Sequence, residues 1–318
     1  ENKEYEIHVA VHVHRDEVII DYSGSSPQAK GPINATLGVA WSAAFNAMLH
    51  LTDQSIPKNS GCFRPIRVIA PAGTIMNVDY PGSEVGGNTE THPLIVCAIF
   101  GAMANCVPQR VMASEGTTHG CFVFGGHDKV TDEPFGGFDF SYVGYGGRSF
   151  ADGNDATDSI NGNCANTPME VFETRFPWIV EEYALRPDSG GAGRHRGGLS
   201  NVKQMLCTGE MLVSQMTNKH KIGAWGLKGG FEGKVGATLY MKSGSEDWKT
   251  AVEAFGKVSP SKYSNIEMQP GDRVRVLAPG GGGFGIPTER SPQAVDDDIA
   301  EGFISVKEAE DKYGFSSG

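Results

Sequence analysis

Six residues of the chain belong to the types used for proton transfer and for binding a developing oxyanion. A carboxylate or an imidazole can act as a general base or acid, and a carboxamide can donate hydrogen bonds to an oxyanion. They are Asn88, Glu90 and His92 directly before an apolar run, Glu115 and His119 at the start of a glycine-rich region, and Asn166 at its end. We take these six as candidate catalytic residues.

A purely structural role for the same side chains stays open at this stage. Asn88 and Asn166 could satisfy backbone groups in turns, as asparagine often does. Glu90 could cap a helix that begins near Pro93. The sequence alone does not separate these two interpretations.

Metal-ligand patterns are weak, and the sequence predicts no metal site in this chain. His8, His12 and His14 alternate along one strand with no carboxylate or cysteine at ligand spacing, which is typical of a solvated strand face. A second group could suggest calcium, but its spacing is not that of an EF-hand loop and favours a solvated turn. This second group is Asp152, Asp155 and Asp158.

Nucleotide-binding motifs also fail. Gly280, Gly282 and Gly285 fit the dinucleotide fingerprint, but Pro287 interrupts it and no βαβ unit can follow so near the end of the sequence. The sequence holds no phosphate-binding P-loop, no His-Glu-x-x-His and no Gly-x-Ser-x-Gly. We therefore expect no cofactor to bind this chain, and we interpret the glycines near residue 280 as a tight turn.

Composition and charge exclude further classes of protein. The 318 residues carry 27 Lys and Arg against 38 Asp and Glu, a formal charge of −11, which argues against nucleic acid as a partner. The longest apolar run, residues 94–104, is about half of what a membrane span requires, and no signal segment opens the sequence. The six scattered cysteines fit buried free thiols. We expect a cytoplasmic protein and, because the sequence opens on Glu1, a piece of something longer.

Hydrophobic periodicity predicts an α+β fold. Residues 7–14 and 18–22 form a hairpin, residues 34–52 a core helix capped by Asn34, and residues 93–105 a second, fully buried helix. Short strands are expected at 66–70 and 75–78. Beyond Pro177 the runs 178–185, 200–207, 211–216, 237–241 and 273–277 predict strands. Helices starting at Ser291–Pro292 and at Ser305 end the chain.

The 43 glycines make residues 115–166 the most unusual part of the sequence. We expect regular elements to be nearly absent there. The eight aromatic residues of this stretch nevertheless favour an ordered, largely buried, polyproline-like segment. This gives four segments, at residues 1–114, 115–176, 177–290 and 291–318.

Several motifs in a fixed order resemble one known family. They are residues 21–28 (DYSGSSPQ), 31–35 (GPINA), 59–66 (NSGCFRPI), 86–91 (GGNTET), 166–170 (NTPME), 186–193 (RPDSGGAG) and 280–285 (GGGGFG). Together they resemble the C-terminal half of hydantoinase B proteins, a family that includes N-methylhydantoinases, 5-oxoprolinases and acetone and acetophenone carboxylases. Ile286 departs from the pattern, because the family usually has aspartate there.

The resemblance implies further properties. The fold would hold β-sheets in a barrel-like arrangement beside polyproline-type segments. ATP would bind a hydantoinase A-type ATPase partner subunit. A divalent metal, zinc or manganese, would belong to the N-terminal half of the large subunit, which this chain lacks.

The function implied is part of the large subunit of an ATP-dependent ketone carboxylase that uses bicarbonate. His92 and His119 favour this reaction over that of a hydantoinase or 5-oxoprolinase-type cyclic amide hydrolase. A non-catalytic scaffold module is the third alternative. It would be favoured if Glu90, His92, His119 and Asn166 lay far apart or faced bulk solvent.

Overall fold

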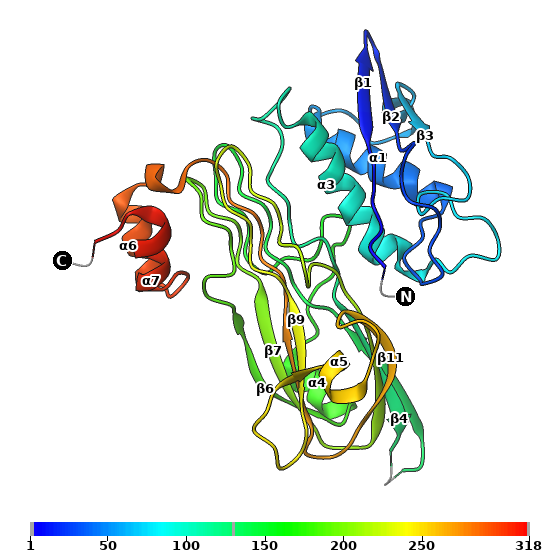
Figure 1. Cartoon of the computed structure of the whole chain (residues 1–318), viewed down its shortest axis with the longest axis vertical. Helices are drawn as coiled ribbons and strands as arrows, with labels where there is room; N and C mark the ends of the chain where they lie inside the picture. Colours follow the sequence, from blue (N-terminus) through cyan, green and yellow to red (C-terminus); the bar gives the residue numbers. More distant parts are fainter. Residues whose placement is uncertain (1–2, 129–130, 317–318) are drawn as a thin grey trace.

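The computed structural model describes residues 3–128 and 131–316 and shows three regions in one continuous fold (Figure 1). A small sheet with the helices α1 and α3 forms one end, and two larger sheets form the other. Between them run many extended segments side by side, and these lead to a small helical cap near the C-terminus. No helix among the described residues is both long and apolar enough to cross a bilayer.

The first region contains a three-stranded sheet in the order β1 (Ala10–His14), β2 (Glu17–Asp21) and β3 (Ile66–Ile69). β1 and β2 form the predicted antiparallel hairpin, and β3 runs parallel to β2. Two helices that pack on each other, α1 (Leu37–Leu51) and α3 (His92–Met103), confirm both helix predictions. The strand predicted at 75–78 is wrong, because residues 75 and 76 form a turn closed by the bridge between Thr74 and Asn77.

The cap of α1 corrects the prediction that Asn34 begins this helix. Thr36 is the N-cap, and its hydroxyl accepts a hydrogen bond from the Val39 amide. The buried Asn34 side chain instead accepts from the Ala29 amide and donates to the carbonyls of Ala29 and Ser83. It therefore ties the start of α1 to the segment that leads into α3.

Two antiparallel sheets form the largest region. One has the order β10 (Lys249–Thr250), β9 (Ala237–Met241), β12 (Arg273–Leu277), β7 (Asn201–Cys207) and β6 (Trp178–Leu185). The other has the order β11 (Lys262–Met268), β8 (Met211–Met216), β4 (Cys121–His127) and β5 (Pro134–Asp139). Their inner faces share one apolar core, so the barrel-like arrangement is an open sandwich of two sheets.

The β4–β5 hairpin corrects the expectation that residues 115–166 lack regular structure. Its strands pair glycine against glycine, Gly125 opposite Gly136, which hid the alternation that identifies a strand. A Cβ on Gly137 would lie 2.6 Å from the Phe124 ring, so the glycine makes room for a buried aromatic. Two of the eight aromatic residues depart from the burial expected for this segment, because Phe138 and Phe150 are 64% and 70% exposed.

The remainder of the glycine-rich region confirms extended, tightly packed segments outside any sheet. A Cβ on Gly146 would lie 1.8 Å from the Ala113 carbonyl oxygen, and one on Gly144 equally close to that of Gly198. Only glycine permits such backbone contacts. The segments are held by backbone hydrogen bonds, among them Gly147 N to Gly282 O at 2.8 Å. The run at 280–283 is part of this packing, so the tight turn predicted there is wrong: the residues are extended and lie against the backbones of other segments.

Short helices complete the chain. α2 (Ser60–Phe63), η1 (Gly87–Thr91), α4 (Met169–Arg175), α5 (Ala251–Phe255) and η2 (Pro287–Glu289) join the larger elements. The two predicted C-terminal helices are α6 (Pro292–Ala300), capped by Ser291, and α7 (Val306–Glu308), capped by Ser305 and followed by η3 (Ala309–Tyr313). Cys97 and Cys207 are buried, whereas Cys106 and Cys164 are exposed, so buried thiols were predicted correctly only in part.

Candidate functional site

Three chain segments meet where the first region joins the glycine-rich packing. One is η1, a single π-helical turn that continues directly into α3. Gly87 makes its position possible, because a Cβ there would lie 2.3 Å from the Asn34 carbonyl oxygen. The others are residues 115–119 and 158–161. Asn161 connects two of them, since its Nδ2 donates to the Asn88 carbonyl at 2.9 Å.

His119 lies at the centre of this junction, 4% exposed, with a hydrogen-bond partner at Nε2 and, at Nδ1, a close ion-pair contact that lacks hydrogen-bond geometry. Its Nδ1 lies 2.7 Å from Asp158 Oδ1, and its Nε2 lies 3.0 Å from Asn161 Oδ1. The Asn161 amide uses its nitrogen toward Asn88, so its oxygen faces the imidazole. Burial alone would lower the pKa of His119, but Asp158 and Asn161 together outweigh it and raise that pKa. The geometry therefore favours the imidazolium form.

Asp158 is the ionised partner of His119. Burial would raise the pKa of its carboxyl, but the contact with His119 and the amide of Cys164 lower it overall. The Cys164 amide donates to its Oδ2 at 3.0 Å. Gly162 lets the loop close over this pair, because a Cβ there would lie 2.0 Å from Asp158 Oδ2 and 2.6 Å from His119 Cε1. A buried ion pair is thus held under a short loop.

Glu115 and its neighbours supply a second protonatable group. The side chain is fully buried, and its Oε1 accepts from the Ser159 hydroxyl at 2.6 Å and from the Ile160 amide at 3.2 Å. Its Oε2 has no hydrogen-bond partner among the described residues. Burial raises the pKa of Glu115 to about 7 despite these donors. This carboxyl can therefore hold or release a proton near neutral pH.

Glu90 is a third buried acid, 1% exposed. Its Oε2 accepts from the Thr118 hydroxyl at 2.7 Å, one residue before His119, while its Oε1 has no hydrogen-bond partner in the described part of the chain. Burial raises the pKa of Glu90, opposed chiefly by the charge of Lys262. Since the Glu90 carboxylate accepts from Thr118, its alternative role as a helix cap is wrong. The N-cap of α3 is Thr91, and no side chain makes a capping hydrogen bond there.

His92 is the neutral histidine of the group. Its Nε2 lies 3.0 Å from the Ser42 hydroxyl of α1, and its Nδ1 is buried without a partner in residues 3–128 and 131–316. Burial, and then the positive charge of His119, lower the pKa of His92 to about 4. At neutral pH this imidazole is therefore uncharged, and it can donate one hydrogen bond and accept another.

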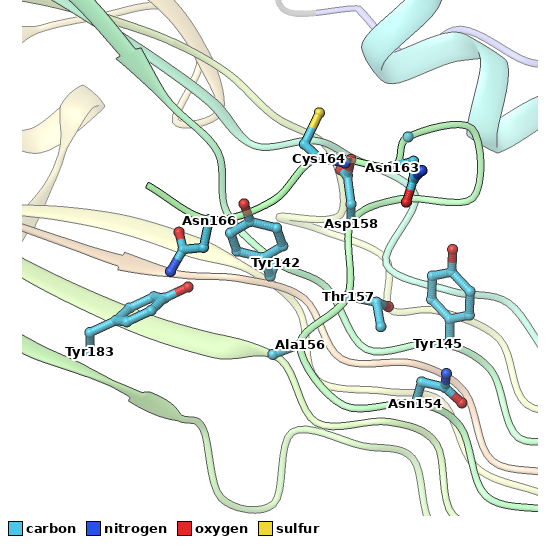
Figure 2. Close-up of a pocket in the computed structure, with 11 residues that line it drawn as sticks. Tyr142, Tyr145, Asn154, Ala156, Thr157, Asp158, Asn163, Cys164, Asn166 and Tyr183 are labelled. Carbon is cyan, nitrogen blue, oxygen red and sulfur yellow. Dashed lines mark hydrogen bonds between the residues drawn. The ribbon is translucent and has the colours of Figure 1, made fainter. Parts of the chain in front are cut away.

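A polar pocket of about 560 Å³ opens beside Asp158 (Figure 2). Its other polar lining comes from Tyr142, Tyr145 and Tyr183, from the asparagines at 154, 163 and 166, from Thr157 and from Cys164. Figure 2 shows the Tyr183 side chain extending toward Asn166 and Tyr142, while Asp158 stands beside Asn163 and Cys164. Asp158 is the only carboxylate in this wall, and His119 lies directly behind it. We call this cavity the polar pocket.

A second cavity of about 360 Å³ lies next to the 158–161 loop. It is lined by Ser42, Phe45, Asn46, Leu49, Phe63, His92 and Asn161. Asn161 therefore faces this cavity while Asp158 faces the polar pocket. His119 contacts Asp158 and Asn161 and therefore connects the walls of the two cavities.

Five of the six predicted residues come together. Glu90, His92, Glu115 and His119 are buried around the junction, and the exposed Asn88 bonds to Asn161 through its backbone. Asn166 is also exposed and lies apart from them, on the opposite wall of the polar pocket.

Sequence reasoning missed Asp158, which it assigned to a solvated turn. That assignment is wrong for the whole group, because Asp155 pairs with Arg196 and Asp152 with Arg290, both at 2.8 Å. A lone aspartate eight residues before the predicted Asn166 gives no local signal of a histidine partner about forty residues earlier.

A metal centre does not fit these residues. Across the described residues, no three histidine, cysteine, aspartate or glutamate side chains are placed to hold a metal ion. His119 and Asp158 are already paired with each other at 2.7 Å. We therefore derive no step through a metal on this chain.

Comparison with known proteins identifies the family. The family model described as Hydantoinase B/oxoprolinase matches residues 1–287, so the chain belongs to this family. It is 32% identical over 303 residues to an uncharacterized protein of Methanocaldococcus jannaschii, covering 95% of this chain and 51% of that protein. It is 30% identical to a putative D-/L-hydantoinase subunit of a Pseudomonas strain (98% and 52%) and to the 5-oxoprolinase of Saccharomyces cerevisiae (88% and 22%).

Two solved structures share the fold. One is an ATP-dependent caprolactamase from Pseudomonas jessenii, with a TM-score of 0.85 and 23% identity over 98% of this chain and 54% of that one. The other is a nucleotide-free acetone carboxylase, with a TM-score of 0.81 and 21% identity over 98% and 45%. The chain thus spans about half the length of several proteins it matches.

Proposed function

We propose that this chain is part of the large subunit of an ATP-dependent enzyme that hydrolyses a cyclic amide. A hydantoinase A-type partner would phosphorylate the amide oxygen, and this chain would act on the activated ring. The observation that carries the proposal is Asp158, an ionised carboxylate in the wall of a polar pocket, backed by the His119 imidazolium at 2.7 Å. Burial of the site together with this pocket supports an enzymatic role over a scaffold.

The ring-opening step needs a proton for the leaving nitrogen. A first water adds its oxygen to the carbonyl carbon, and the C–N bond breaks as the nitrogen gains a proton, which leaves an acyl phosphate. A second water then hydrolyses this acyl phosphate to the carboxylate and inorganic phosphate. Asp158 touches the pocket and can relay the proton that His119 holds. Glu115, with a pKa of about 7 and bonded to Ser159 next in sequence, is placed to restore it.

Ketone carboxylation, which the histidines favoured at first, is the second candidate. The fold shared with acetone carboxylase supports it. Against it, the uncharged His92 supplies no positive charge for a bicarbonate anion. The relatives at 30% identity are also a hydantoinase subunit and a 5-oxoprolinase, proteins named for cyclic amides.

Product analysis separates the two. The complete complex that contains this chain is incubated with magnesium ATP, a hydantoin and a lactam as substrates, and ¹³C-bicarbonate with acetone or acetophenone. We expect ring-opened product in step with phosphate release. Incorporation of ¹³C without ring opening would replace our proposal by the carboxylase.

A further inference from the structure

The cavity beside His92 combines a flat apolar wall with a few uncharged polar groups. The rings of Phe45 and Phe63 stack with centroids 4.4 Å apart and planes at 20°, and Leu49 extends this wall by one turn of α1. A 360 Å³ space is ample for one small ring, since a cavity of about 150 Å³ holds benzene. We call it the apolar pocket.

The polar side of the apolar pocket is tied to the candidate site. Asn46 Nδ2 donates to the Ile160 carbonyl at 3.4 Å, which holds the 158–161 loop against α1. Asn161 lines the pocket and bonds His119 through its oxygen. A group bound against Phe45 and Phe63 therefore lies beside the residue that contacts the His119 imidazole.

Charge is the second observation. None of the residues that line the apolar pocket is Lys, Arg, Asp or Glu, and its only titratable side chain, His92, is neutral at pH 7. The polar pocket likewise has no Lys or Arg in its lining, and its Asp158 is ionised. A carboxylate on a substrate would find no cation in either cavity and a negative charge in one.

We propose that the apolar pocket binds an apolar, preferably aromatic, ring substituent of the cyclic amide, and that the enzyme rejects substrates with a free carboxylate such as 5-oxoproline. This rests on the proposed function and names the substrate class within it. The flat Phe45–Phe63 wall accepts the substituent, and the amide extends past Asn161 to Asp158, which His119 contacts.

The test compares three substrates in the complete ATP-supplied complex. Relative to unsubstituted hydantoin, 5-benzylhydantoin should show a kcat/KM about 10- to 100-fold higher, the range expected when such a group is buried. Hydantoin-5-acetic acid and 5-oxoproline should be turned over at least 10-fold more slowly than 5-benzylhydantoin. Equal rates, or a preference for the carboxylates, would overturn the inference and leave the proposed function in place.

Variants locate the effect. Leu49→Ala and Phe63→Ala should each lower the ratio of kcat/KM for 5-benzylhydantoin to that for hydantoin at least fivefold, and Leu49→Arg should raise kcat/KM for the carboxylate substrates. Leu37→Ala, on the exposed face of the same helix, is the matched control. If both pocket variants retain the benzyl preference, the pocket assignment is wrong. If no cyclic amide is opened at all, the proposed function fails, and this inference fails with it.

Discussion

Replacing Asp158 by asparagine tests the central ion pair directly. Asparagine keeps one oxygen, which can still accept from the Ser159 amide, and it loses the charge facing His119 together with the acceptor for the Cys164 amide. The side chains of His119 and Asp158 are 6% and 7% exposed, so solvent screens the pair little. Leaving one charge of a buried pair unpaired costs about 3–5 kcal/mol. We expect a loss of about 3 kcal/mol in unfolding free energy at pH 5.5.

The cost should depend on pH in a defined direction. Because the pKa of His119 is raised in the folded state, the ion pair stabilises the fold fully at pH values below the ordinary histidine pKa of 6.5. This stabilisation is lost as the pH rises through the pKa of His119 in the folded state. Because the pKa of Asp158 is lowered in the folded state, this group stabilises the fold at pH values above the ordinary aspartate pKa of 3.8. This stabilisation is lost as the pH falls through the pKa of Asp158 in the folded state. Both contributions are therefore complete between about pH 4 and 6.5.

The assay is urea unfolding of the wild type, Asp158→Asn, His119→Gln and the double variant at pH 5.5 and 9.5. The double-mutant cycle should give a coupling of about 2 kcal/mol at pH 5.5 and less than half of that at pH 9.5. His14→Gln, on the exposed strand face, should change neither value. A coupling that is absent, or equal at both pH values, would refute the ion pair.

Three further predictions follow from the same structure. Gly146→Val should abolish folding, detected as loss of the cooperative thermal transition. Gly31→Ala should keep this transition, because a Cβ at Gly31 meets nothing within 4 Å. A folded Gly146→Val protein would contradict the close backbone packing. Because the pKa of Glu115 is raised, the unfolding free energy of the wild type should fall by up to about 3 kcal/mol between pH 4.5 and 7.5. Glu115→Gln should remove this dependence on pH. The same dependence in the wild type and the variant would contradict the burial of Glu115. The isolated chain should bind no ATP by calorimetry, and micromolar affinity would refute this.

Periodicity predicted those elements whose residues alternate or repeat in the usual way. The β1–β2 hairpin, α1, α3 and most strands after Pro177 belong to this class. β11 escaped because a register shift between Tyr263 and Ile266, with Asn265 at φ 54°, breaks its alternation. β4 and β5 escaped because glycine occupies positions where a strand usually has a side chain.

The candidate site was predictable only in part. Residue types made Glu90, His92, Glu115 and His119 candidates, because acids and histidines before an apolar run or at the start of a glycine-rich region are unusual enough to notice. Asp158 could not be found in this way. Its partner is 39 residues away in sequence, and the contact exists only because glycines such as Gly162 let the loop close over His119. The protonation states depend on that burial and were equally out of reach.

The most direct test of the account is whether Asp158→Asn separates ATP consumption from ring opening. In the complete complex, the partner should still phosphorylate the amide, and attack of water at phosphorus returns the amide and releases phosphate without ring opening. Ring-opened product should fall about 100-fold or more, the contribution expected of a positioned acid or base. His14→Gln should match the wild type in both. Ring opening at the wild-type rate in Asp158→Asn would contradict the claim that this site carries out the step after activation.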